Sequence, residues 1–173
     1  MRPFVKVLVA LGAALVVATT STSASADSGG KSGWEPYQTP PFDLAAGVTC
    51  SFELRGDIVY DREFTRVVER FPDGTPKVVD TVGALGVRFT NVGSGESVLR
   101  DASGALRAIF HAGGGIDFLF GGNGIAVIRT PNALYPAGAY VVSGSVVFIV
   151  HPDGSREFTN QHGTLENMCQ TLA

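Results

Sequence analysis

The sequence predicts an all-β protein: an antiparallel meander of about eight strands that closes into a small β-barrel, with its first and last strands linked by a disulfide. Three observations lead to this prediction. Segments rich in β-branched and aromatic residues alternate with turn sequences roughly every 8 to 15 residues. No segment shows a sustained helical period. The two cysteines, Cys50 and Cys169, lie near opposite ends of the strand-rich region.

The first 26 residues have the features of a secretory signal peptide. Arg2 and Lys6 precede an apolar run over residues 7–18, and a small-residue site, Ala24-Ser25-Ala26, follows it. A membrane-spanning helix needs about 20 apolar residues, so a run of 12 is too short to span a bilayer. An anchor that is never cleaved is the alternative. We therefore expect a secreted protein that has no membrane segment after cleavage.

Cleavage after Ala26 leaves 147 residues (173 − 26), which is the size of one domain. Residues 27–45 are rich in Gly, Ser and Pro and are predicted to be a flexible tail, and residues 46–173 to be the barrel domain. Without Arg2 and Lys6 the chain has 11 basic and 16 acidic residues, a net charge of −5. A mildly acidic chain without a basic stripe argues against a nucleic-acid partner or an anionic lipid surface.

The strand pattern begins near residue 48, where apolar and polar residues alternate up to Arg55. A long segment over residues 58–71 follows, and residues 72–76 form a hairpin turn in which Asp73-Gly74 supplies positive φ angles. The next strand, residues 77–92, contains glycines that often mark a bulge or a bend.

Shorter strands and turns continue to the C-terminus. The remaining strand segments are residues 97–100, 105–112, 116–120, 125–130, 139–150, 156–161 and 164–169. Residues 71–85 and 151–165 resemble each other, because both contain Pro-Asp-Gly, then a glycine, then a leucine at matched positions. Duplication of a hairpin would explain the likeness, and so would the ordinary chemistry of tight turns.

The cysteines distinguish between closed and open architectures. Two cysteines in an exported chain are most simply one disulfide, here across a separation of 119 residues (169 − 50). The loop-entropy model assigns such a bridge roughly 5 kcal/mol. A bridge holds its two Cα atoms within about 7 Å, so the first and last strands would meet and the meander would close. A sandwich remains the alternative architecture.

Several segments resemble small exported proteins of unknown function from high-GC Gram-positive bacteria. These segments are GVRFTNVGSGESV with its Phe89-Thr90-Asn91, Gly-Asn-Gly leading into an apolar strand, the strand Val146–Val150, and the ending HGTLENMCQTLA with Cys169. The resemblance covers residues 50–173 and implies export and a barrel-like domain, but no activity. The predicted meander is also similar, in architecture only, to lipocalin and to allene-oxide-cyclase or dirigent barrels.

The segment 58–71 has the most chemical character. On a strand, Tyr60, Arg62, Phe64 and Arg66 share one face, and the charged Asp61, Glu63 and Glu69 lie on the other. One interpretation is an exposed strand with cross-strand ion pairs. The other places the four residues in the barrel mouth, where arginine would hold an anionic group and the aromatics would cover its apolar part. A one-residue bulge would exchange the two faces.

No motif predicts a catalytic residue, a metal or a cofactor. The three histidines, His111, His151 and His162, have no recognised ligand spacing, although His151, Asp153 and His162 flank one hairpin. The glycine clusters lack the residues of a phosphate-binding loop or of a nucleophile elbow.

The leading hypothesis is a non-catalytic domain that binds a small apolar or amphipathic ligand, or that acts by its surface. The alternatives are a cyclase-like or isomerase-like enzyme of the barrel lumen and a structural component of the cell envelope. The sequence does not predict an oligomeric state.

Overall fold

In a computed structural model, residues 33–173 form a single antiparallel sheet of nine strands and one short helix. The predicted signal peptide (1–26) and the start of the predicted tail (27–32) lie outside the described residues. The elements are β1 (Glu35–Tyr37), β2 (Phe42–Leu44), β3 (Leu54–Arg70), β4 (Pro76–Asn91), β5 (Ser97–Asp101), β6 (Gly104–Phe110), β7 (Ile116–Ile128), β8 (Gly138–Val150), β9 (Arg156–Asn167) and α1 (Met168–Thr171). The all-β antiparallel prediction is confirmed.

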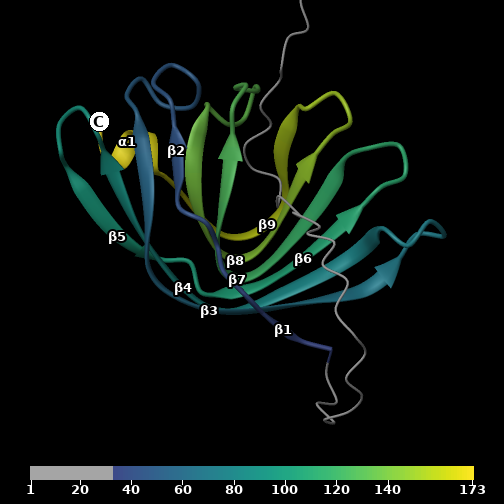
Figure 1. The fold of residues 1–173 in the computed structure, drawn as a ribbon. Coiled ribbons are helices and arrows are strands. Elements are labelled where there is room, and N and C mark those ends of the chain that lie inside the picture. The colour runs from purple at the N-terminus through teal and green to yellow at the C-terminus, as the bar shows by residue number, and fades with distance from the viewer. Residues whose placement is uncertain (1–32) are drawn as a thin grey trace, which may run out of the picture. The chain divides into compact units, whose positions relative to one another are not determined.

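The strands follow one another as a meander in the order β1-β3-β4-β6-β7-β8-β9, with β2 also paired to β3 and β5 to β4 (Figure 1). β9 does not pair with β1 or β3 within residues 33–173, so the sheet is not closed. The predicted barrel is therefore not confirmed. The strands β1 and β2 fall within residues 27–45, the range expected to be tail, and both are held by pairing to the edge of β3.

Three hairpins with the same turn geometry lie at one end of the sheet (Figure 1). They begin at Phe71, His111 and His151, which are spaced by 40 residues. In each, the first residue's amide donates to the carbonyl four residues later, and the amide three residues later donates back to the first carbonyl. Glycine with φ near +85° occupies that fourth position each time. The likeness between residues 71–85 and 151–165 thus extends to a third hairpin that lacks Pro-Asp-Gly.

A row of glycines crosses five strands and bends the sheet. Its members are direct partners on β4, β6, β7, β8 and β9: Gly83, Gly104, Gly122, Gly144 and Gly163. We call this row of five residues the glycine crease. Side chains do not fit along it. A Cβ at Gly163 would lie 1.8 Å from the carbonyl oxygen of Ser143, and Gly144 has a φ of +105°. Figure 1 shows the long strands bent near their middles, where this row lies.

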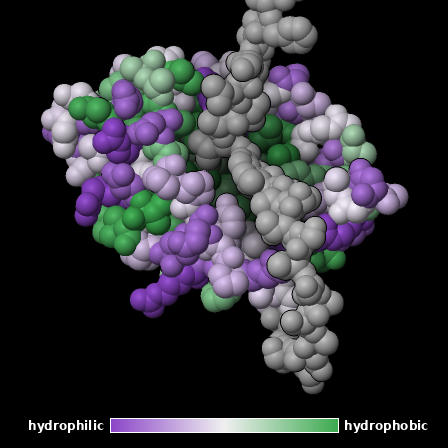
Figure 2. Space-filling model, viewed as in Figure 1, coloured by the Kyte–Doolittle hydropathy of each residue, from purple (hydrophilic) through white to green (hydrophobic). Residues whose placement is uncertain are grey.

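Two hydrophobic cores lie on opposite faces of the β7–β8 pair. The first core joins β4 to β7, β8 and α1, and it includes Phe89, Val141 and Met168. The second lies where β7, β8 and β9 bend, and it includes Phe120, Val142 and Phe158. Because Val141 and Val142 serve different cores, this stretch is buried on both faces and reads as a continuous apolar run. In Figure 2, green hydrophobic residues are visible in the hollow between the arms of the bent sheet.

The disulfide between Cys50 and Cys169 is confirmed, with a Cα–Cα distance of 5.1 Å. It does not join two strands, however, and this corrects the predicted element boundaries. Residues 48–53 form turns and bends ahead of β3, and residues 168–171 form α1 because the Asn167 side chain caps the helix by accepting from the Cys169 amide. The bridge therefore fastens a loop to a helix over the end of the first core, and it leaves the sheet edges apart.

Candidate functional site

The half of the sheet that carries the three hairpins has one face without a covering layer of strands. Cross-strand register arranges this face in three rows. From the glycine crease outward, the rows are Phe64, Val82, Ala105, Gly121, Ser145, His162; Arg66, Asp80, Arg107, Leu119, Val147, Thr159; and Glu69, Val78, Ile109, Asp117, Ile149, Glu157. We call this surface the outer face. Phe64 is 45% exposed and Leu119 37% exposed, so large apolar side chains meet solvent here.

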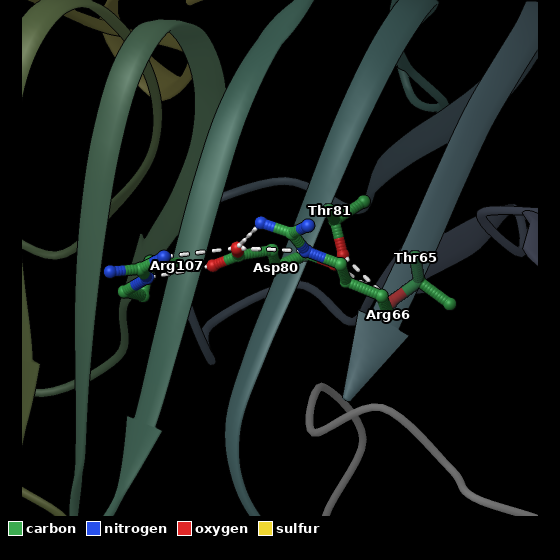
Figure 3. Close-up of polar contacts among 5 residues, drawn as sticks. All are labelled: Thr65, Arg66, Asp80, Thr81 and Arg107. Carbon is green, nitrogen blue, oxygen red and sulfur yellow. Dashed lines mark hydrogen bonds and ion pairs between the residues drawn. The ribbon is translucent and has the colours of Figure 1, made fainter. Parts of the chain in front are cut away.

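Asp80 lies between two arginines in the middle row (Figure 3). It is 7% exposed and directly opposite Arg66 on β3 and Arg107 on β6. Arg66 Nη2 donates to Asp80 Oδ2 over 2.9 Å, and Arg107 Nε donates to Oδ1 over 2.7 Å. The hydrogen bond from Arg107 and then that from Arg66 lower the pKa of Asp80, against the opposing effect of burial. The carboxylate thus fixes the positions of both guanidinium groups.

Trp34 also contacts the guanidinium group of Arg66. The guanidinium carbon of Arg66 lies 4.5 Å from the centre of the indole ring, a cation–π contact. The pairing of Glu35 with Thr65 positions Trp34 there, because it makes β1 the neighbour of this part of β3. Both arginines use Nε and Nη2 for Asp80. Their Nη1 groups have no hydrogen-bond partner among residues 33–173 and are available to a ligand.

Replacing Asp80 with asparagine is expected to cost about 2 kcal/mol of unfolding free energy at pH 7, because charge-assisted hydrogen bonds are lost. The cost is below that of a fully buried pair because both arginines are partly exposed. Since folding lowers the pKa of Asp80, its contribution is present above the unfolded value of about 3.9 and disappears as the pH falls through the folded value.

Urea unfolding of wild type and Asp80→Asn between pH 7 and pH 3 tests this expectation. The difference between the two proteins should be largest near neutral pH and should shrink below about pH 4. Asp43→Asn is the matched control, because its ion pair with Arg55 is solvent-exposed and should matter little. A difference that stays constant across this range would contradict the assigned role of Asp80.

The four residues predicted to bind a ligand do share one face of β3, but that face is not the interior. Register places them opposite to the buried Leu85, which belongs to the first core. Phe64 and Arg66 belong to the outer face. Arg62 lies two residues before Phe64 on β3, so its side chain points to the same side of the sheet. Tyr60 lies across the glycine crease, where its ring covers Gly86 and its hydroxyl donates to Asp101. The structure therefore gathers Phe64 and Arg66 beside Asp80, and Arg62 lies just beyond the glycine crease on the same face.

Sequence reasoning missed Asp80, Arg107 and Trp34 as partners of this group. Asp80 and Arg107 are lone charges within apolar strands, which is a visible signal. Their pairing with Arg66 follows only from the register of three strands.

A second polar cluster lies on the opposite side of β3, next to its edge. The Thr39 hydroxyl donates to Glu63, and the Thr39 amide donates to Asp61 Oδ2 over 2.7 Å. Burial raises the pKa of Glu63, and the nearby charge of Asp61 raises it further, while the Thr39 hydrogen bond opposes both effects. Burial also raises the pKa of Tyr37, which pairs with Glu63 in the sheet. A carboxyl group with a raised pKa beside a second carboxylate is suited to acid–base chemistry.

The other possible sites within residues 33–173 bring together fewer functional groups. No group of three His, Cys, Asp or Glu side chains there is placed to hold a metal ion. His111 pairs with Asp117, and His151 with Glu157, on neighbouring hairpins. Two shallow depressions occur, one of about 390 Å³ at the hairpin tips beside Phe71 and one of about 240 Å³ beside the buried Tyr140. No helix in this part of the chain is long and apolar enough to cross a bilayer.

Comparison of the chain with protein-family models, with curated proteins and with solved structures found no significant match.

Proposed function

We propose that this protein is an exported, non-catalytic interaction domain that binds a macromolecular partner through its outer face. One observation carries the proposal: exposed Phe64 and Leu119 lie on the same face of the sheet as two arginines fixed on Asp80. Arginine and aromatic residues are enriched at binding interfaces, where they combine apolar contact with directed hydrogen bonds. An antiparallel sheet face that only met water would instead be largely polar.

The interior favours surface binding over the carriage of a small ligand. A carrier encloses its ligand in an apolar cavity of a few hundred Å³. Each of the two cores is filled by its own side chains, one core on each face of β7 and β8. The two depressions described above are open to solvent. Export is supported by the signal-like N-terminus and by the disulfide, a bond typical of oxidising compartments.

Sedimentation with cell envelopes tests the proposal. The protein, purified from culture medium with its disulfide intact, is mixed with envelopes of the cells that export it and then centrifuged. We expect wild type to sediment and the double variant Phe64→Glu, Leu119→Glu to bind at least tenfold more weakly, because two charges replace apolar contacts. Leu134→Glu is the control, because Leu134 is 76% exposed in the loop between β7 and β8, away from the outer face.

Unfolding midpoints should first show that all three proteins are folded. If wild type stays in the supernatant, or if the double variant sediments as well as wild type does, the proposal is wrong.

An acid–base enzyme is the second candidate, favoured by the polar cluster around Glu63. Burial raises the pKa of this carboxyl, so it holds a proton more readily than an ordinary glutamate does, next to the carboxylate of Asp61. A carbon-13 NMR titration of the Glu63 carboxyl measures this directly. A midpoint at or below the ordinary glutamate value of about 4.3 would remove the support for this candidate.

A further inference from the structure

We infer that the outer face binds a linear anionic polysaccharide, whose carboxylate groups are held by Arg62, Arg66 and Arg107 and whose sugar rings pack on Trp34 and Phe64. This inference rests on the proposed function and specifies the chemistry of the partner.

The surface around Arg62, Arg66 and Arg107 is locally positive, although the chain as a whole is negative at −3. Each acidic residue of the third row already has a partner within the protein: Glu69 contacts Lys77, Asp117 contacts His111, and Glu157 contacts His151. Near the crease, Arg62, Arg66 and Arg107 share one face of the sheet with two carboxylates, Asp80 and Asp101. Arg62 makes no ion pair with any residue of the described chain. Three arginines against two carboxylates leave an excess of one positive charge around the crease.

The spacing of the arginines suits an extended ligand better than a single small anion. Arg62 and Arg66 are four residues apart on one strand, a distance of about 13 Å. Arg66 and Arg107 lie two strands apart, but their guanidinium groups converge on the carboxylate of Asp80 and so form one pair. A small anion reaches only one of the two positive sites, the arginine pair or Arg62, whereas a longer ligand reaches both. Separate anionic groups along one chain can each meet one guanidinium, whose planar donors match a carboxylate.

The aromatic residues favour sugar rings between those anionic groups. Phe64 lies between Arg62 and Arg66 on the same face of β3, and 45% of it is exposed. Trp34 flanks Arg66 on the side of β1. The face of an aromatic ring carries partial negative charge, and the axial C–H groups of a pyranose carry partial positive charge, so the two attract. An alternation of arginine and aromatic groups thus matches an alternation of carboxylates and ring faces.

The same geometry disfavours an acidic peptide. Extended peptides commonly bind to sheets by adding a strand at a free edge, where main-chain hydrogen bonds provide affinity. The edge of β3 beside Arg66 is already occupied, because β1 pairs with residues 63–65. At residues 63–65, beside Phe64 and Arg66, the site therefore offers side chains on a sheet face, and β1 occupies the main-chain edge.

Binding to defined polymers tests the inference. The disulfide-intact exported protein is titrated calorimetrically with alginate, a linear polyuronate, with dextran as a neutral polysaccharide, and with poly-L-glutamate as an acidic peptide. We expect binding to alginate alone, and weaker binding at 200 mM than at 50 mM NaCl because salt screens exposed charges. Equal binding of poly-L-glutamate, binding of dextran, or no binding of alginate would overturn the inference.

Two variants locate the site. Arg62→Ala should weaken alginate binding about tenfold without affecting the fold, because Arg62 has no partner in the described chain. The double variant Arg66→Lys, Arg107→Lys keeps both charges near Asp80 but removes the planar donors, and it should weaken binding at least fivefold. Arg88→Ala is the control, since Arg88 is an exposed arginine of β4 beyond the glycine crease. Equal affinity of Arg62→Ala and Arg88→Ala would overturn the assignment.

The two proposals fail in different ways. If alginate does not bind while the double variant at Phe64 and Leu119 still prevents envelope sedimentation, the ligand class is wrong and the interaction face stands. If wild type neither binds alginate nor sediments with envelopes, both proposals are wrong.

Discussion

Removing the disulfide, as Cys50→Ala with Cys169→Ala, is expected to lower the free energy of unfolding by about 2–5 kcal/mol. The bridge spans 119 residues and so restricts most of the unfolded domain. It also holds α1 against the first core, where Met168 and Leu172 are almost fully buried. Because β9 has no strand partner on its outer side within residues 33–173, no sheet hydrogen bonds replace the bridge at that end.

Urea unfolding followed by fluorescence of the single tryptophan, Trp34, measures this change. Wild type treated with a reductant should approach the stability of the double variant, and the variant itself should not respond to reductant. Unfolding midpoints that coincide for oxidised wild type and for the variant would show that the bridge is not needed to hold α1.

Replacing Gly144 with alanine is expected to destabilise the protein by about 3 kcal/mol, because two costs combine. Its φ of +105° is strained for any residue with a Cβ, and that Cβ would lie 2.5 Å from the carbonyl oxygen of His162. The Cβ would be attached to β8 and the carbonyl oxygen belongs to β9, and the two strands are paired at this point. Neither atom can therefore move away without opening the β8–β9 ladder. The bend at the glycine crease, and with it the second core, depends on this close approach.

Gly121→Ala is the matched control, because Gly121 lies on the neighbouring strand one row from the crease. A Cβ there would have nothing closer than 3.9 Å, and its φ is not positive. This change should be neutral or slightly stabilising, because alanine restricts the unfolded chain more than glycine does. Equal thermal stability of the two variants would show that the crease does not require glycine.

The sequence by itself determined the local features. Alternation of side chains predicted most of the strands and placed Arg62, Phe64 and Arg66 on one face, which the structure bears out. The breaks predicted at residues 56–57, 121–124 and 162–163 are wrong, because β3, β7 and β9 continue through them. Turn chemistry located the hairpin at Asp73-Gly74, and the presence of only two cysteines identified the bridge. The strands and turns depend on residues close together in the chain. The disulfide follows because two cysteines can form only one intramolecular bridge.

The tertiary structure alone decided how the strands combine. Five glycines that look like isolated bends in the sequence become one crease only when the register of five strands aligns them. Register likewise brings Asp80 between Arg66 and Arg107, and the crease determines that Phe64 and Arg66 lie outside the cores. The physical reason is that side-chain alternation repeats every two residues along one strand, whereas register and curvature arise from contacts between strands that the local pattern does not encode.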